Sequence, residues 1–131
     1  MMVMVDTTVW VDFFHARPLS HVEMLESMLA NGDDICICGI VLTEVLQGIR
    51  RDAEFRSTRN LFSHLLFVPM QYTTFVEAAE IYRHLRQNGI TIRKTVDCMI
   101  AAAAIENGIS LLHNDRDFDF IRDYSGLKTI S

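Results

Sequence analysis

The stretch Met2–Asp6 has the sequence MVMVD, four apolar residues that end in an acid. A continuous apolar run of this kind is typical of a strand that is buried on both faces, as in a parallel sheet. A second apolar run, Ile109–Leu112, is followed closely by Asp115. Because open α/β sheets bind their ligands at the carboxyl ends of the strands, we expect Asp6 and Asp115 to lie near one another at one edge.

Segments with helical periodicity alternate with short apolar runs along the rest of the chain. Further strands are predicted at 35–38, 66–68 and 128–130. Helices are predicted near 9–14, 20–32, 41–50, 52–65, 74–89, 95–108 and 117–124. Ser20 and Glu23 match an S-x-x-E capping box at the start of the second helix, and Thr95 is a candidate cap of the sixth. Strands that alternate with helices predict an α/β sandwich with a mainly parallel sheet.

The 131 residues, 50% of them apolar and 22% charged, are expected to form a single domain over residues 1–131. The first residues lack the pattern of a secretory signal, and no apolar run approaches the roughly 20 residues of a membrane span. We therefore expect a cytoplasmic protein with no membrane partner. The three cysteines are an odd number, which argues against a disulfide scaffold. Cys36 and Cys38 are expected to be small buried residues.

Two further acids are predicted on helices between the strands. Glu44 lies away from the apolar stripe of its helix, and Asp97 lies in the first turn of another. Each acid alone has an ordinary explanation, as a turn residue, an exposed helix residue or a partner of the helix dipole. Together with Asp6 and Asp115, they predict one acidic pocket. Clustered carboxylates repel one another unless a cation intervenes, and Mg²⁺ or Mn²⁺ suits a site made only of oxygen ligands.

The charge distribution is consistent with such a pocket. The net charge of −5 arises from 17 acidic and 12 basic residues. Without the four acids above and Asp117, the remaining 12 acids balance the 12 bases. The basic residues form two clusters, at Arg50, Arg51, Arg56 and Arg59 and at Arg83, Arg86, Arg93 and Lys94. Each cluster is either a solvated helix face or a set of phosphate contacts beside the pocket.

The acids lie in four short motifs that span nearly the whole chain. The motifs are VMVDTTVWVD (Val3–Asp12), LTEVLQG (Leu42–Gly48), TVDCMIAA (Thr95–Ala102) and LHNDRDF (Leu112–Phe118). In order and spacing they resemble the motifs of PIN-domain ribonucleases, specifically the VapC toxins of bacterial toxin–antitoxin pairs. Each motif is short, and the specificity of the resemblance comes from the four together.

The resemblance implies a PIN-domain α/β/α sandwich with a central, mainly parallel sheet. It also implies a Mg²⁺- or Mn²⁺-dependent endoribonuclease toxin that hydrolyses RNA phosphodiesters with metal-activated water. The usual targets of such toxins are structured RNAs such as tRNA or rRNA. By position, Asp6, Glu44, Asp97 and Asp115 match the catalytic and metal-binding acids of the family, and Asp117 matches a fifth acid that some members use at the metal.

Polar side chains near these acids are candidates for hydrogen bonds to the metal ligands. They are the hydroxyls of Thr7, Thr8 and Thr95 and the amide of Asn114. Thr8 is the best of them, since it follows the first acid by two residues and stands where the family often has Ser or Thr. His113 replaces a residue that is frequently Thr in the family. It is a possible base, ligand or RNA contact, although a packed or solvated histidine is the simpler expectation.

The resemblance further implies a homodimer and a cognate VapB-type antitoxin, which together form a hetero-oligomer. The C-terminal segment of such antitoxins lies in a groove of the toxin and can place an Arg or Lys in the acidic pocket. We expect this groove along the segments Trp10–Phe14 and Val41–Leu66. Trp10 and Phe14, four residues apart on a helix, are expected to pack rather than to stack on RNA bases.

Three alternatives fit the acids less well. A phosphatase of the haloacid dehalogenase type needs a second acid two residues after the first, where this chain has Thr8. A response-regulator receiver domain needs a phosphate-accepting Asp at the end of the third strand, where the chain has Val68, Pro69 and Met70. A PIN fold that serves only as a binding scaffold does not require the complete set of acids present here.

Overall fold

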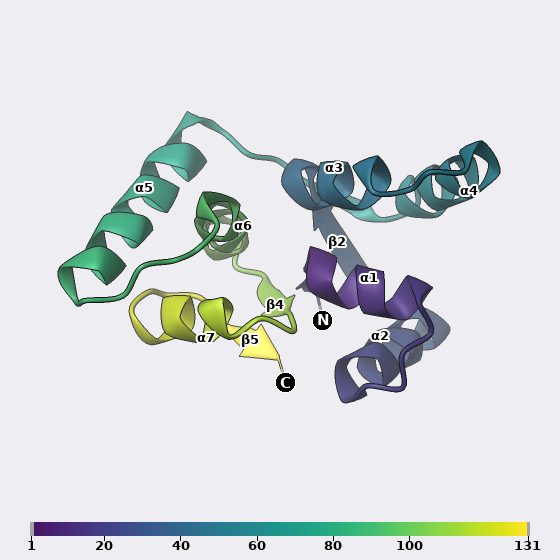
Figure 1. Ribbon diagram of the computed structural model, residues 1–131, viewed down its shortest axis with the longest axis horizontal. Helices are drawn as coiled ribbons and strands as arrows, with labels where there is room; N and C mark the ends of the chain where they lie inside the picture. The colour runs from purple at the N-terminus through teal and green to yellow at the C-terminus, as the bar shows by residue number, and fades with distance from the viewer. Residues whose placement is uncertain (1, 131) are drawn as a thin grey trace.

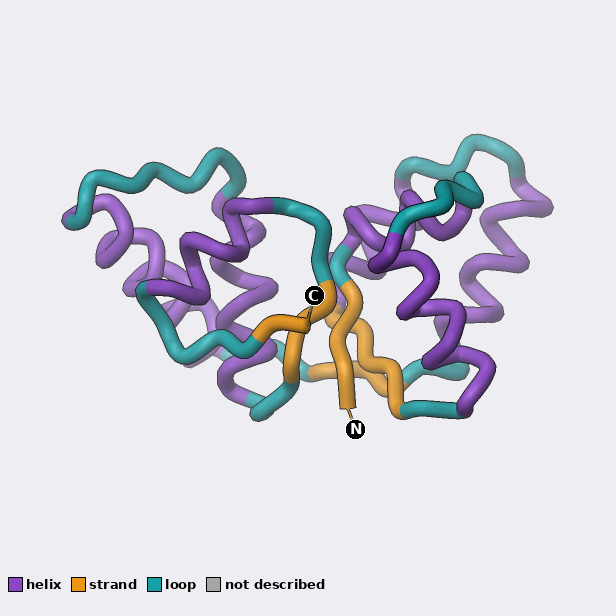
Figure 2. The backbone as a smooth tube through the Cα atoms, turned by 90° about the horizontal axis from the view of Figure 1, so that it is seen from below, coloured by secondary structure: helices purple, strands orange, loops and turns teal. Residues whose placement is uncertain are grey.

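The computed structural model describes residues 2–130, in which a five-stranded sheet lies between two groups of helices (Figures 1 and 2). The strands are β1 (Met2–Val5), β2 (Asp34–Cys38), β3 (Leu66–Val68), β4 (Ser110–Leu112) and β5 (Thr129–Ile130). The helices are α1 (Thr7–Phe14), α2 (Ser20–Asn31), α3 (Gly39–Gln47), α4 (Asp52–Phe62), α5 (Tyr72–Gln87), α6 (Thr95–Glu106) and α7 (Arg116–Asp123). This is the expected α/β/α sandwich.

The strand order β3-β2-β1-β4-β5 determines where a ligand site can form. Every pairing in the described sheet is parallel. From β1 the chain moves outward to β2 and β3, and it then returns to place β4 on the other side of β1. Helices α1 to α4 cover one face and α5 to α7 the other (Figure 1). The carboxyl ends of β1 and β4 therefore form a topological switch point, where open α/β sheets bind their ligands.

The hydrophobic core surrounds β1, whose residues Val3–Val5 are fully buried. On one face, Trp10 of α1 is fully buried and its ring centroid lies 4.9 Å from that of Phe62 in α4. Phe14 stacks on Trp10 with a centroid distance of 6.0 Å, as its spacing of four residues predicts. On the other face, Ala101–Ala104 of α6 are fully buried, and their small side chains allow this helix to pack closely against its neighbours.

Helix ends differ from the sequence expectations in two places. Ser20 is the first residue of α2 and not its N-cap. Leu19 holds the N-cap position, and within the described chain this helix has no side-chain capping hydrogen bond there. Lys94, not Thr95, holds the N-cap position of α6. The C-terminal end of α2 is as predicted, since Gly32 adopts a left-handed conformation with φ of 70°, which glycine adopts without a Cβ clash.

Cys36, Cys38 and Cys98 are buried free thiols, as expected for small residues of a core. Within residues 2–130, none of the helices combines the length and the hydropathy that a membrane crossing requires.

Candidate active site

Asp6 follows β1 directly and caps the N-terminus of α1. Its backbone N–H donates to the carbonyl oxygen of Leu112 at 2.9 Å, which joins the ends of β1 and β4. Its Oδ2 atom accepts hydrogen bonds from the backbone N–H of Thr8 at 3.1 Å and from the Thr8 hydroxyl at 2.7 Å. Burial nevertheless raises the pKa of Asp6 above its ordinary value, against these hydrogen bonds, and the charge of Glu44 adds to the effect.

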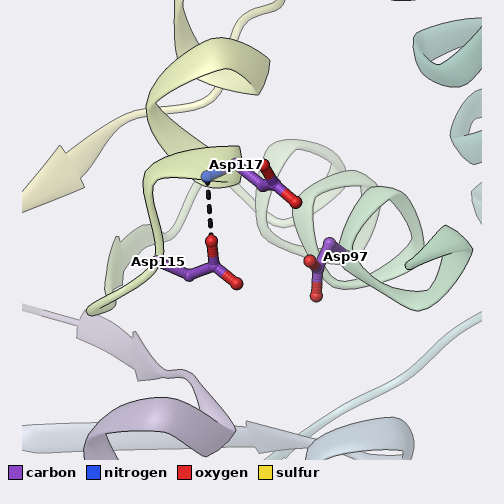
Figure 3. A group of neighbouring side chains, drawn as sticks. All are labelled: Asp97, Asp115 and Asp117. Atoms are coloured by element: carbon purple, nitrogen blue, oxygen red, sulfur yellow. Dashed lines mark hydrogen bonds between the residues drawn. The ribbon is translucent and has the colours of Figure 1, made fainter. Parts of the chain in front are cut away.

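Three further acids converge from α6 and α7 on the same end of the sheet. Asp115 caps α7 and accepts a hydrogen bond from the backbone N–H of Asp117 at 3.0 Å. Asp97 lies in the first turn of α6. Each of the three carboxylates offers an oxygen atom within 4.8 Å of the others, and the side chains face a shared space (Figure 3). These atoms are close enough to coordinate one cation.

Asp97 is a strongly perturbed acid of this group. Its side chain is 2% exposed, and its Oδ2 atom has no hydrogen-bond partner within residues 2–130. Burial raises the pKa of Asp97 to about 7; Lys94 opposes this rise, whereas Asp6, Asp115 and Asp117 add to it. A buried carboxylate oxygen without a donor is costly, and a cation bound at this group would supply the partner that the atom lacks within residues 2–130.

Glu44 lies at the border of the site rather than in the group of three. It comes from α3 and is half buried, and its Oε1 atom accepts a hydrogen bond from the Thr7 hydroxyl at 2.7 Å. Its charge reaches Asp6, whose pKa it raises. The structure thus brings all five predicted acids to the same end of the sheet, with Asp97, Asp115 and Asp117 forming the tightest group.

Thr8 connects the two strand ends. Its hydroxyl donates to Asp6 and accepts a hydrogen bond from the backbone N–H of Asn114 at 3.0 Å. The amide of Asn114 donates to Oδ2 of Asp12 at 3.2 Å. Thr95 is exposed, and no side-chain hydrogen bond joins it to the rest of the described chain. Its predicted supporting role therefore remains a prediction.

Asp12 is a buried polar residue that the sequence analysis did not select. Its carboxylate accepts hydrogen bonds from Asn114, from Nη1 of Arg17 at 3.1 Å and from Nε2 of His21 at 2.7 Å. The pKa of Asp12 is lowered, because the hydrogen bonds and charges of these partners outweigh its burial. The only sequence signal was an acid next to apolar residues in the first motif, which does not identify its partners.

His113 packs beneath the site. Its Nδ1 atom accepts a hydrogen bond from the backbone N–H of Asp115 at 3.1 Å, and its ring lies 5.2 Å from that of Phe118. Its Nε2 atom is 3.5 Å from Oδ1 of Asp119. Burial lowers the pKa of His113, with the opposing charge of Asp119 as the next influence. A neutral ring held in this way supports the loop that carries Asp115.

Two basic residues approach the acids from the loop before α6. The guanidinium of Arg93 contacts Asp115 and Asp117, and Nζ of Lys94 lies 3.9 Å from Oδ1 of Asp97. The residues present fit a divalent cation, because the group offers only oxygen ligands and includes the partnerless Asp97 oxygen. Asp97, Asp115 and Asp117 would hold such an ion, with Asp6 beside them.

Comparison with known sequences gives concordant matches. The PIN domain family matches residues 3–123. Ribonuclease VapC11 of Mycobacterium tuberculosis and VapC ribonuclease Mb1587 of Mycobacterium bovis are each 33% identical to this chain over 132 residues, which cover 99% of this chain and 98% of each relative. Ribonuclease VapC18 of Mycobacterium tuberculosis is 30% identical over 134 residues, covering 98% of this chain and 93% of the relative.

Solved structures share the fold. A chain in the DNA-bound VapBC2 structure from Rickettsia felis aligns with a TM-score of 0.77 and 25% identity, over 99% of this chain and 98% of that one. A chain of DNA-bound VapBC from Salmonella typhimurium aligns with a TM-score of 0.78 and 21% identity, over 99% and 97%. The matches in sequence and structure cover the entire site described above. The chain belongs to the PIN-domain family, among the VapC ribonucleases.

Proposed function

We propose that this protein is the toxin of a type II toxin–antitoxin pair, an endoribonuclease that requires Mg²⁺ or Mn²⁺ and hydrolyses phosphodiester bonds of structured RNA such as tRNA or rRNA. The observation that carries the proposal is the group formed by Asp97, Asp115 and Asp117, with its partnerless buried oxygen, in a chain of this family. We also propose that residues 1–131 act as one domain. An RNA target places the activity in the cytoplasm.

The proposed roles of the acids follow from their positions. A bound divalent cation lowers the pKa of a water molecule and neutralises charge on the phosphate. Asp97, Asp115 and Asp117 would hold the ion, and Asp6 would add to its anionic surroundings. Glu44, at the open border of the site and held by the Thr7 hydroxyl, is placed to orient the attacking water or accept its proton. Thr8 keeps Asp6 in one orientation.

A groove on the surface of α1, α3 and α4 fits the proposed antitoxin contact. It encloses about 350 Å³ and has Val11, Phe14 and Val45 as apolar walls, with Arg50, Arg51 and Glu54 at its rim. It extends to Glu44 at the border of the site. It also lies on the two segments that the sequence analysis assigned to the antitoxin. We propose that an apolar antitoxin segment binds here, within a hetero-oligomer built on a toxin homodimer.

The test is cleavage of total cellular RNA by the purified protein with Mg²⁺, with Mn²⁺ and with EDTA. Asp97→Asn removes one ligand charge from the tight group. Asp123→Asn is the matched control, because Asp123 is an exposed acid of α7 that pairs with Arg122. Discrete fragments that require the metal, vanish with Asp97→Asn and persist with Asp123→Asn are expected. Equal cleavage by Asp97→Asn, with circular dichroism showing the same fold, would refute the site.

A further inference from the structure

The loop between α5 and α6 places a cation directly on the acidic group. Arg93 has a side chain that is 70% exposed, yet its guanidinium contacts two nearly buried carboxylates. Its Nε donates to Oδ2 of Asp117 at 3.2 Å, and its Nη2 donates to Oδ1 of Asp115 at 3.2 Å. These contacts raise the pKa of Arg93, with the hydrogen bond to Asp117 as the largest cause. Arg93 is thus a solvent-exposed arm whose charged end lies over the site.

The guanidinium contacts acids that belong to the proposed metal-binding group. Asp115 and Asp117 both offer oxygen atoms to the group with Asp97. Oδ1 of Asp115 already accepts the backbone N–H of Asp117 and Nη2 of Arg93. A cation that binds these acids withdraws charge from the same carboxylates and repels the guanidinium that is hydrogen-bonded to them. The two positive groups therefore compete for Asp115 and Asp117.

We infer that Arg93 is a displaceable internal counterion: it offsets part of the negative charge of Asp115 and Asp117 until a divalent cation takes its place, and the released guanidinium then binds the phosphate backbone of the RNA. This inference rests on the proposed function and assigns a substrate-binding role to a residue outside the acids. Lys94, whose Nζ lies 3.9 Å from Oδ1 of Asp97, is a second positive charge at the site.

The proposed binding of Arg93 to an RNA phosphate follows from the exposure of its side chain and the chemistry of the guanidinium. Because the side chain is 70% exposed, few contacts hold it in place once a cation engages the two carboxylates. A guanidinium is suited to phosphate oxygens, which it binds in pairs through its planar fork. A bound cation weakens the attraction of Asp115 and Asp117 for the guanidinium, and the phosphates of the substrate are then competing anions for Arg93. The release of Arg93 therefore couples occupation of the acidic site to RNA binding.

The first experiment measures Mn²⁺ binding without RNA, by titration calorimetry and by the electron paramagnetic resonance signal of free Mn²⁺. Arg93→Gln removes the competing charge and is expected to lower the Kd for Mn²⁺ by about threefold to tenfold, within the range for two exposed ion pairs. Arg93→Lys keeps the charge without the fork and is expected to lie between Arg93→Gln and the unaltered protein. Arg122→Gln is the matched control, since Arg122 pairs with Asp119 and Asp123 outside the acidic group.

The outcomes of this experiment distinguish failure of the counterion role from failure of the proposed function. A lower Kd for Arg93→Gln with an unchanged Kd for Arg122→Gln supports the counterion role. An unchanged or higher Kd for Arg93→Gln would overturn it, because Arg93 would then be incidental or would arrange the acids for the metal. Absence of Mn²⁺ binding in the unaltered protein would instead overturn the proposed function, and the inference with it.

The second experiment measures RNA cleavage at saturating Mn²⁺ over a range of salt concentrations. Arg93→Gln is expected to raise KM several-fold with little change in kcat. The slope of log KM against log salt should become shallower by about 0.7 to 0.9, the value for one lost phosphate contact. Arg93→Lys should restore most of that slope. An unchanged KM and salt slope for Arg93→Gln would overturn the phosphate-binding half of the inference.

Discussion

Replacing Asp97 by asparagine is expected to stabilise the metal-free protein at neutral pH while it weakens metal binding. The carboxylate is 2% exposed, its Oδ2 atom has no partner within the described residues, and three other acids raise its pKa. Asparagine has nearly the same shape and no charge. The substitution therefore removes the cost of burying a carboxylate whose proposed partner is a cation.

The magnitude follows from the pKa of Asp97, which rises from 3.8 to about 7 in the folded protein. Between these values the folded protein keeps a proton on Asp97 that the unfolded chain has released, so the free energy of unfolding falls as pH rises. At about 1.4 kcal/mol per pKa unit, the full cost is at most about 4 kcal/mol. It vanishes below about pH 3, where Asp97 is protonated in both states, and it is complete above about pH 8.

The assay is urea unfolding in EDTA at pH 5, 6, 7 and 8. The advantage of Asp97→Asn over the unaltered protein should grow from pH 5 to 7 and then level off. The control Asp123→Asn, an exposed acid, should show no such trend. With Mn²⁺ in place of EDTA, the unaltered protein should be more stable than Asp97→Asn, because only the unaltered protein binds the ion tightly. A difference that is independent of pH, or an unaltered protein that is more stable at pH 8 in EDTA, would refute the reasoning.

Three further predictions concern the supports of the site and the groove. Thr8→Val should weaken Mn²⁺ binding by about tenfold to a hundredfold, because Asp6 loses the hydroxyl that orients it; equal affinity in calorimetry would exclude this role. Asp12→Asn should lower the free energy of unfolding by about 1–3 kcal/mol, since its bonds to Arg17 and His21 are charge-assisted; urea curves at pH 7 measure it, and identical midpoints would contradict it. Phe14→Ala should weaken binding of the cognate antitoxin in calorimetry without altering Mn²⁺ affinity, and unchanged antitoxin binding would place the contact elsewhere.

The outline of the fold was readable from local patterns. All five predicted strands match the observed ones within one residue at each end. β1 and β2 are largely buried apolar runs, as is typical of a parallel sheet, whereas Leu66 and Phe67 of β3 are exposed. Helices were located by their apolar period, with ends that shifted by up to three residues. The N-cap residues of α2 and α6 were predicted wrongly. A capping motif shows which residue types favour a helix start, but the path of the preceding chain decides at which residue the helix begins.

The sequence by itself determined the α/β class, the five acids and the family, because each depends on residue types and spacing along the chain. Only the tertiary structure decided which of these acids form the tight group, and that Thr7 holds Glu44 from 37 residues away. Only the tertiary structure likewise joins Asp12 to Asn114, 102 residues away, and Arg93 to Asp117, 24 residues away. Such contacts depend on the strand order and on the paths of the loops, because these bring residues together that are remote in sequence. Contacts of this kind leave no periodic pattern in the sequence.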